Sequence, residues 1–282
     1  MSTRLPVIAA IPNYNMAKGL KRLLPQLLKQ DYDHIYVLDD ASTDDSEAVV
    51  KSFGKNISFI KSTKNKGSGA ARNLILAELS APTLIHFIDA DVSVVSENNA
   101  SIIRELGIDD TVGFVSGLVI DKTGLQSLWN YGPKRSLPNT LNAVFLSFIS
   151  RIESHSRGTR NFSGIYTIFR SWPNPHVKPR RRHIFWACEA NLVIRSDTFA
   201  LLGGFDEHIR EDDILPLAYT AKTLGLTNIF DPRLISRTHD DIAVRMYNRR
   251  RAFIQAEIYI IKTYGKLIYW LFPFLEKQKN RR

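Results

Sequence analysis

Two short apolar runs in the first hundred residues each end in a pair of acidic residues. Residues 34–40, HIYVLDD, end in two aspartates, and residues 83–91, TLIHFIDAD, end in Asp89 and Asp91. Runs of this length and composition are typical of strands buried in a parallel sheet. A carboxylate that follows such a strand must leave the apolar interior, because it needs water, a hydrogen bond or a cation. The chain therefore has to bring these acids to an accessible edge of a sheet.

Strand-like and helix-like segments alternate along the first 92 residues, as periods of apolar residues indicate. Strands are expected at 5–12, 34–40, 57–62 and 83–91, and helices at about 20–28, 44–53 and 68–79. Pro25 falls within the first helix, so we expect that helix to be kinked or to begin late. The alternation predicts an α/β fold, Rossmann-like, with a mostly parallel sheet flanked by helices. Sites in such folds lie beyond the carboxyl ends of the strands.

The second half of the chain has a less regular pattern. Strands are expected at 111–120, 185–196 and 228–239, with helices at 141–152 and just before Gly225. The stretch between residues 121 and 185 is rich in Ser, Arg, Pro and aromatic residues and contains no motif that we could assign.

The C-terminal residues 258–282 combine large aromatic and aliphatic residues with a basic tail. This composition suits a helix that packs on the domain, which we favour, or a helix that lies in a membrane interface. The pattern divides the chain into a domain over 1–240 and a helical extension over 241–282. Within the domain the pattern changes at about residue 92, from the regular alternation of 1–92 to the less regular 93–240.

The net charge of +10 over 282 residues is concentrated in a few clusters, among them KPRRRH at 178–183. Such charge favours polyanionic partners, which include phosphate-bearing substrates, anionic lipid and nucleic acid. The single cysteine excludes an intrachain disulfide and fits a reducing compartment. No secretory signal and no long apolar run are evident. We therefore expect a cytoplasmic protein, with a peripheral position at the inner face of a membrane left open by the basic clusters.

Asp89 and Asp91 flank Ala90 directly after a strand, so both side chains can face one crevice. Two carboxylates held close together repel each other unless a cation lies beside them. Hard oxygen ligands suit Mg²⁺ or Mn²⁺, and these ions are usually shared with the phosphates of a substrate. A D-x-D pattern is common by chance, so its meaning depends on the rest of the chain.

The motifs that accompany this pattern resemble those of the family 2 glycosyltransferases, which have the GT-A fold. The resemblance covers most of residues 5–240 and is closest in the first 92 residues. It rests on the following segments, which occur in the order of the family: IPNYN (11–15), LLKQ (27–30), VLDDASTDDS (37–46), NKGSGAARN (65–73), DAD (89–91), CEANLVIRSDTFALLGGFDE (188–207), EDD (211–213) and RTH (237–239). Each segment is short, but together they are specific.

The resemblance implies a nucleotide-binding half at 1–92 and an acceptor half at 93–240, so we expect the choice of acceptor to be determined within 121–185. Within the first half it implies a nucleotide site at the first strand ends. The residues at the matching positions are Pro12, Tyr14, Asn15, Asp40, Lys66, Gly67 and Asp89. A carboxylate such as that of Asp40 can accept a hydrogen bond from a base, and Tyr14 can stack on the base. Alternatively, Asp40 caps the next helix and Tyr14 packs in a turn. Arg72 and Asn73 match the family's motif, and they either bind the ligand or stabilise the loop before them.

The resemblance also implies a divalent metal cofactor, Mn²⁺ or Mg²⁺, held by Asp91 with Asp89 and His239. A lone histidine after a strand is otherwise often structural. Glu211 and Asp212 match the family's catalytic pair, and Asp212 would be the general base. Acids at this position also suit the first turn of a helix without any catalytic role.

Some residues depart from the family's pattern. Ile214, Leu215 and Ala218 stand where an acid, a leucine and an arginine are common, so the geometry of the acceptor side is less secure than the fold. Trp129 and two further tryptophans, Trp172 and Trp186, can stack on sugar rings, but we expect them to pack in the core.

These observations predict an inverting, metal-assisted, hexosyltransferase-like enzyme of polysaccharide or glycolipid biosynthesis. The donor would be a nucleoside-diphosphate sugar, with a UDP-sugar favoured, and the acceptor a hydroxyl of a glycan or a lipid-linked molecule. An anionic membrane surface is a further expected partner. A sugar-phosphate nucleotidyltransferase is an alternative, although the first strand lacks its Gly-rich basic loop. A basic protein that binds nucleic acid is another, but no binding module is evident, and no nucleic acid partner is expected.

Overall fold

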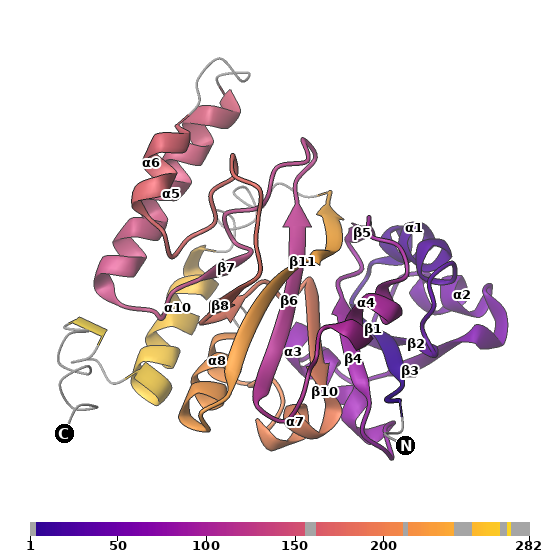
Figure 1. The fold of residues 1–282 in the computed structure, drawn as a ribbon. Coiled ribbons are helices and arrows are strands. Elements are labelled where there is room, and N and C mark those ends of the chain that lie inside the picture. Colours follow the sequence, from indigo (N-terminus) through magenta and orange to yellow (C-terminus); the bar gives the residue numbers. More distant parts are fainter. Residues whose placement is uncertain (1–3, 156–161, 211–213, 240–249, 266–269, 272–282) are drawn as a thin grey trace.

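The computed structural model describes residues 4–155, 162–210, 214–239, 250–265 and 270–271. In this part of the chain a nine-stranded sheet runs through the molecule, and helices cover both of its faces (Figure 1). The expected α/β class is therefore confirmed. None of the helices described is both long enough and apolar enough to cross a bilayer.

The strands of the large sheet follow the order β3-β2-β1-β4-β10-β6-β11-β5, with β8 paired to β11. Their bounds are β1 (Val7–Asn13), β2 (His34–Asp39), β3 (Ile57–Lys61), β4 (Leu84–Ile88), β5 (Val92–Val94), β6 (Val112–Ile120), β8 (Arg182–Ile184), β10 (Asn191–Arg195) and β11 (Thr227–Thr238). Strands β3, β2, β1 and β4 are parallel, whereas β10 is antiparallel to both of its neighbours. A separate ribbon pairs β7 (Tyr131–Gly132) with β9 (Trp186–Ala187).

The helices connect these strands and cover the sheet. Their bounds are α1 (Ala17–Leu27), α2 (Ser46–Lys51), α3 (Ser68–Asn73), α4 (Asn99–Glu105), α5 (Leu137–His155), α6 (Ser163–Ile168), α7 (Ser196–Leu201), α8 (Ile214–Thr223) and α10 (Arg250–Ile260). Short 3-10 turns follow at η1 (Gly54–Asn56) and η2 (Leu74–Ala77), and a π turn at η3 (Ile261–Gly265).

Alternate residues of the N-terminal strands pack on opposite faces of the sheet. Ala9 and Ile11 belong to a cluster with the leucines of α1, whereas Ile8 and Ala10 belong to a cluster on the other face. That second cluster also contains Leu146 of α5 and residues of α7, α8 and α10. The period of two along each strand thus places the strand ends between two packed layers, which makes the edge beyond them rigid.

The described part of the C-terminal extension packs on the domain. Ala256 and Ile260 of α10 are buried in the main core cluster. Tyr259 and Tyr264 donate hydrogen bonds to Asp206, at 2.9 and 2.8 Å. Burial alone would raise the pKa of Asp206, but these bonds and those from His208 outweigh it and lower the pKa. The predicted domain boundary at residue 240 lies outside the described residues.

Two of the expected elements differ in detail. The strand expected to reach residue 91 ends at Ile88. The next backbone N–H, that of Asp89, still donates to the carbonyl of Ala190, at 3.4 Å. The first helix begins at Ala17 and continues past Pro25 to Leu27, with its four leucine side chains buried.

Candidate active site

The carboxyl ends of β1 and β2 are joined by buried polar side chains. Asn13, at the end of β1, donates to Asp39 at 2.6 Å, and the two residues are also partners in the register of the strands. Asp39 is fully buried and accepts a second bond, at 2.8 Å, from the backbone of Ser42. Asp39 therefore fixes the strand ends and has no surface left for a ligand.

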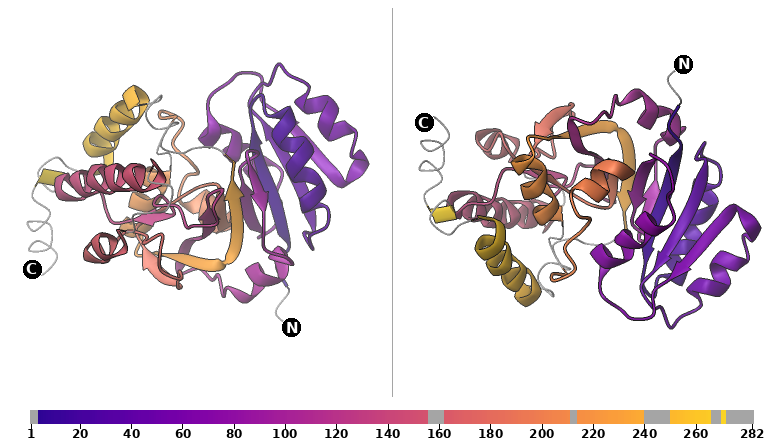
Figure 2. Two further views of the ribbon diagram at one scale, coloured as in Figure 1. Left: turned by 90° about the horizontal axis from the view of Figure 1, so that it is seen from above. Right: turned by 90° about the horizontal axis from the view of Figure 1, so that it is seen from below.

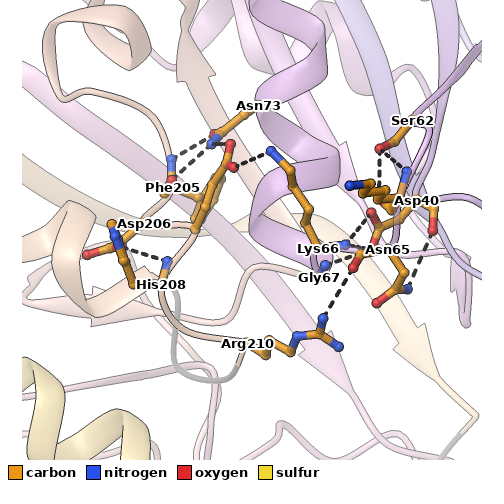
Figure 3. Close-up of polar contacts among 12 residues, drawn as sticks. Asp40, Ser62, Asn65, Lys66, Gly67, Asn73, Phe205, Asp206, His208 and Arg210 are labelled. Atoms are coloured by element: carbon orange, nitrogen blue, oxygen red, sulfur yellow. Dashed lines mark hydrogen bonds and ion pairs between the residues drawn. The ribbon is translucent and has the colours of Figure 1, made fainter.

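Asp40, the next residue, holds the loop that precedes α3. Its carboxylate accepts hydrogen bonds from the backbone N–H groups of Lys66, at 2.9 Å, and Gly67, at 2.7 Å (Figure 3). Gly67 has φ of 108°, which a residue with a side chain rarely adopts, and a Cβ there would lie 3.3 Å from Cγ of Arg210. In this structure the carboxylate of Asp40 therefore shapes the loop, and its Oδ atoms face backbone donors.

Three predicted residues lie at the end of β1 or in the loop that follows it. Pro12 is buried within the strand, whereas the side chain of Tyr14 is 48% exposed. Asn15 adopts a left-handed conformation, with φ of 54°, and accepts a 2.8 Å bond from the backbone of Thr43. The loop after β1 is thereby tied to the loop after β2, and Tyr14 remains available at the rim of the strand ends.

Lys66 and Asn73 connect the loop before α3 to the loop 203–207. The ammonium of Lys66 lies 3.1 Å from Glu207, and Asn73 donates to Glu207 at 3.2 Å (Figure 3). Asn73 also exchanges two bonds with the backbone of Phe205, at 2.8 and 2.9 Å. The bonds from Asn73 and Lys66 lower the pKa of Glu207. A Cβ at Gly204 would lie 2.6 Å from Asn73, so a glycine is needed there.

Asp89, at the end of β4, forms an ion pair with Arg72 of α3. The two side chains approach to 2.7 Å, and Arg72 is only 2% exposed. The guanidinium of Arg72 also lies 5.2 Å from the centre of the Phe205 ring. One oxygen of Asp89 is thus held by a buried cation, which orients the carboxylate at the edge of the sheet.

Asp91 and His239 lie at the ends of neighbouring strands. The antiparallel pairing of β5 with β11 joins Val92 to Thr238, so Asp91 directly precedes β5 and His239 directly follows β11. His239 contacts the hydroxyl of Ser93 of β5 at 2.7 Å, whereas Asp91 lies in the turn between β4 and β5, where the backbone N–H of Val92 donates to the carbonyl of Asp89 at 3.3 Å. The two predicted ligands therefore lie at adjacent strand ends on one edge of the sheet.

The packing of α1 supports the turn that carries Asp91. A Cβ at Gly19 would overlap the carbonyl oxygen of Ala90, so the helix approaches the turn as closely as only a glycine allows. Arg22, one turn later, donates to the carbonyl of Asp91 at 3.0 Å. The backbone of the turn is thus fixed from the side of α1.

These residues fit a divalent cation of the hard type. Among the residues described, no cluster contains three or more His, Cys, Asp or Glu side chains arranged to hold a metal. Mg²⁺ and Mn²⁺ are nevertheless bound by as few as one or two protein ligands when phosphates and water complete the shell. Asp91 with His239 supplies such a pair, while Asp89 is engaged by Arg72.

The predicted catalytic pair, Glu211 and Asp212, lies outside the described residues. The residues on either side of it contact the site. Arg210 donates to the carbonyl of Asn65 at 3.2 Å, and the backbone of Ile214 donates to Glu189 at 3.3 Å. Arg210 is therefore attached to the loop that Asp40 holds, and Ile214 lies beside Glu189, close to the strand β10 that pairs with β4.

Sequence reasoning did not single out Glu189, Glu207 and Arg210. Each contacts a partner that is far away in the chain; Arg210, for example, bonds to a residue 145 positions earlier. The available signal was the position of Glu189 and Glu207 inside segments that resemble the family's motifs.

The three tryptophans pack against one another with ring centres 6.0 to 6.4 Å apart, and Trp172 and Trp186 are buried.

Comparison with solved structures relates the fold to that of nucleotide-sugar enzymes. A GalNAc-T7 structure with UDP, GalNAc and Mn²⁺ matches 84% of this chain and 44% of its own at a TM-score of 0.59 and 12% identity. The mannosyltransferase PcManGT of Pyrobaculum calidifontis, in complex with GDP-Man and Mn²⁺, matches 90% of this chain and 65% of its own, at 0.55 and 18%. TarS of S. aureus matches 89% of this chain and 39% of its own, at 0.53 and 16%. These likenesses establish the GT-A fold.

Comparison with curated proteins gives a local match. The teichoic acid poly(glycerol phosphate) polymerase of Staphylococcus epidermidis is 35% identical over 82 residues, which are 28% of this chain and 11% of the relative. The chain thus spans about a tenth of that curated relative. The family model described as glycosyl transferase family 2 matches residues 8–167, which is more than half of the chain. The chain belongs to glycosyl transferase family 2.

Proposed function

We propose that this enzyme transfers a sugar, with inversion, from a nucleoside-diphosphate sugar to an acceptor hydroxyl. The observation that carries the proposal is the convergence of Asp40, Asp89 and Asp91 at one edge of the sheet, where His239 follows the strand that pairs with β5. Backbone N–H groups stabilise the carboxylate of Asp40, and the buried Arg72 stabilises that of Asp89, so neither depends on another cationic side chain. They form a rigid frame for a ligand that brings a metal and phosphates with it.

The nucleotide would lie over the ends of β1 and β2. Tyr14 offers an exposed ring for stacking on the base, and the loop at Lys66 and Gly67 brings backbone and an ammonium close to the phosphates. Asp40 would act mainly by holding this loop, with contact to the base as its second role. We favour a UDP-sugar as the donor, in keeping with the UDP in the GalNAc-T7 structure.

Asp91 and His239 would hold the divalent cation. When bound, such an ion stabilises the negative charge that develops on the departing diphosphate. Asp89, oriented by Arg72, would accept hydrogen bonds from the ribose of the donor. The two carboxylates of the D-x-D pattern would thus have different roles: Asp91 would bind the metal, and Asp89 is held in place by Arg72.

Asp212 would remove the proton of the acceptor hydroxyl as it attacks the anomeric carbon. Its described neighbours support this role, because Arg210 contacts the donor-side loop and Ile214 contacts Glu189. An attack from the side opposite the departing diphosphate inverts the anomeric configuration. The acceptor would be a hydroxyl of a glycan or lipid-linked polymer, a class to which the local likeness to a teichoic acid polymerase directs attention.

Calorimetric binding of UDP, GDP and dTDP, each with and without Mn²⁺, tests the donor site. We expect metal-dependent binding of one nucleotide that becomes at least about tenfold weaker in Asp91→Ala, the equivalent of losing one well-placed charged contact. Asp110→Ala, which removes an exposed aspartate of a distant turn, is the matched control. If none of the nucleotides binds to the wild type, the proposal is wrong.

The mechanism requires a separate assay. With the donor identified, Asp212→Asn should reduce turnover by about 100-fold or more while nucleotide binding stays unchanged, because a general base acts only on the acceptor proton. NMR of the product should show the inverted anomeric configuration. Retention of configuration, or full turnover of Asp212→Asn, would contradict the assignment of the base.

A further inference from the structure

The positive charge of the chain is concentrated in two segments, residues 122–188 and the C-terminal residues 241–282, with net charges of +10 and +7. Residues 122–188 contain eleven Lys or Arg and a single acid, Glu153. The rest of the chain has more acids than basic residues, so it offsets the charge of 241–282 and leaves a total of +10. The segment 122–188 includes α5 and α6, which lie side by side on the flank of the molecule away from β1, β2 and β3 (Figures 1 and 2).

Helix α5 presents an apolar stripe to the solvent. Leu141, Val144, Phe145 and Phe148 follow one another at helical spacing and are 60, 65, 44 and 59% exposed. The opposite face of the helix is buried, with Leu146 among the core residues. A helix that is apolar on both faces needs a second apolar environment besides the core of its own domain.

Helix α6 extends this stripe. The ring of Phe169, which follows α6, lies 5.9 Å from that of Phe145, centre to centre, and the adjacent Ile168 is 74% exposed. We define the α5–α6 face as the exposed residues Leu141, Val144, Phe145, Phe148 and Ile168. Large exposed apolar side chains are thus concentrated on one flank of the molecule.

Two exposed cations border the α5–α6 face. Arg151, at the end of α5, and Arg170, just after α6, are exposed. The only acid of the segment, Glu153, accepts hydrogen bonds from the backbone of Phe162 at 2.7 Å and the hydroxyl of Tyr166 at 2.9 Å. Its carboxylate is therefore used in joining α5 to α6. The surroundings of the stripe favour a partner that is both apolar and anionic.

We propose that the α5–α6 face docks the enzyme on an anionic lipid bilayer, with its apolar side chains at the level of the acyl boundary and its arginines at the headgroups. An interfacial helix of this kind combines apolar burial with attraction to anionic lipid. A soluble polyanion would leave the exposed leucine and phenylalanine side chains in contact with water. A second copy of the chain would have to bring two positively charged faces together, since the two sides of a symmetric interface are identical.

This inference assigns the membrane contact to a different element from the one that the sequence indicated. The C-terminal extension was expected to be the alternative membrane element, but Ala256 and Ile260 of α10 are buried in the domain. The α5–α6 face lies instead within the segment where we expect the choice of acceptor to be determined. Docking through it would bring that segment to the surface from which a lipid-linked acceptor is presented.

Flotation of the full chain with vesicles tests the proposal. Vesicles of phosphatidylcholine alone are compared with vesicles that also contain phosphatidylglycerol. The wild type should float with the anionic vesicles, and Val144→Glu combined with Phe148→Glu should reduce the bound fraction at least tenfold. The matched control is Leu201→Glu combined with Leu224→Glu, which places the same two charges at positions that are 65% and 47% exposed and should bind like the wild type. Nucleotide binding and thermal melting verify that each variant is folded.

The charge contribution is tested with Arg151→Gln combined with Arg170→Gln, which should remove the preference for anionic vesicles and the sensitivity of binding to salt. The proposal fails if the wild type binds neither kind of vesicle, or if the Glu variant binds as the wild type does. It also fails if the wild type is a dimer without vesicles that the Glu variant converts to a monomer, because the face would then be an interface between copies. Equal binding to both kinds of vesicle would overturn the assignment to anionic lipid.

Discussion

Residues 1–92 and residues 122–188 contain the same number of basic side chains, eleven each, but ten acids accompany the first set and one accompanies the second. In the first region, pairs such as Arg72 with Asp89 and Lys51 with Glu47 neutralise charge within the fold. In the second region the excess charge borders an exposed apolar stripe. The comparison teaches that the first region pairs its cations with its own acids, whereas the second region has almost no acids of its own, and its paired cations, such as Arg135 and Arg181, contact Glu257 and Asp231 of other segments.

The largest effect is expected where a cation of the first region is removed. Arg72→Ala leaves Asp89 without its buried partner, and the loss of one member of such a pair costs about 3–5 kcal/mol of the free energy of unfolding. We expect a value near 3 kcal/mol, because Asp89 keeps some access to water. Chemical denaturation of the two proteins measures the difference.

The control for this comparison is a cation of the second region. Arg170→Ala removes an exposed arginine and should change stability by less than about 0.5 kcal/mol. Adding Asp89→Asn to Arg72→Ala should recover part of the lost stability, because the unpaired charge is then absent. Similar costs for Arg72→Ala and Arg170→Ala would show that the two regions use their cations alike.

A buried histidine of the first region makes stability depend on pH. His86 lies between the hydroxyl of Tyr32 and the Oδ1 of Asn191, each at 2.7 Å. The Nδ2 of Asn191 donates to the carbonyls of Leu118 and Leu234, so its Oδ1 accepts from Nε2–H of His86. His86 Nδ1 then accepts from Tyr32, and the ring is neutral. Burial lowers the pKa of His86 from 6.5 to about 4.

Because the pKa of His86 is lower in the folded state, the unfolded chain binds the proton more readily. The free energy of unfolding is therefore greatest above pH 6.5 and falls as the pH decreases from 6.5 towards 4, by about 3 kcal/mol in total. Denaturation at a series of pH values measures this loss. The exposed His183 of the second region is the control, since His183→Gln should leave the slope unchanged. A flat profile between pH 6.5 and 4 would contradict the assignment.

The two regions also differ in how far sequence predicts them. The strands and helices up to Ile88 were predictable because each strand is a short apolar run and each helix has an apolar face, whereas β5 and α4 were not predicted. The long helix α5 was expected over 141–152 and extends from Leu137 to His155, and its apolar residues on both faces gave no clear period. When a helix has apolar residues on both faces, its sequence lacks the single apolar stripe by which a helix and its bounds are predicted.

The site shows a similar limit. Positions after the strands indicated Asp40, Asp89 and Asp91, because strand ends converge. Their partners were not predictable in the same way, because Arg72 could equally well have bound the ligand, and Glu207 contacts Asn73 across 134 residues of sequence. Asp91 and His239 are brought to the same edge of the sheet by the pairing of β5 with β11, and this pairing is known only from the structure.

Close packing is the next difference that a mutation can measure. Gly19→Ala places a methyl group against the backbone oxygen of Ala90, and backbone must move to admit it. We expect a loss of about 1–3 kcal/mol, as for other overpacked sites, together with weaker metal-dependent nucleotide binding through displacement of Asp91. Gly164→Ala in α6 is the matched control, since its Cβ would meet no atom within 4 Å. Unchanged binding by Gly19→Ala would show that the turn is not fixed by α1.

The smallest effect on stability is expected for the exposed pair of Lys66 and Glu207, whose side chains are 58% and 42% exposed. Exposed ion pairs contribute about 0–1 kcal/mol, so Glu207→Gln should be nearly neutral in denaturation, and Asn73 can still donate to the amide oxygen. Its effect on the donor site is more informative. If Lys66 binds the diphosphate, Glu207 competes for the same ammonium, and Glu207→Gln should strengthen nucleotide binding, while Lys66→Gln weakens it. If both variants bind the nucleotide as the wild type does, Lys66 belongs to the internal charge balance of the first region and not to its ligand site.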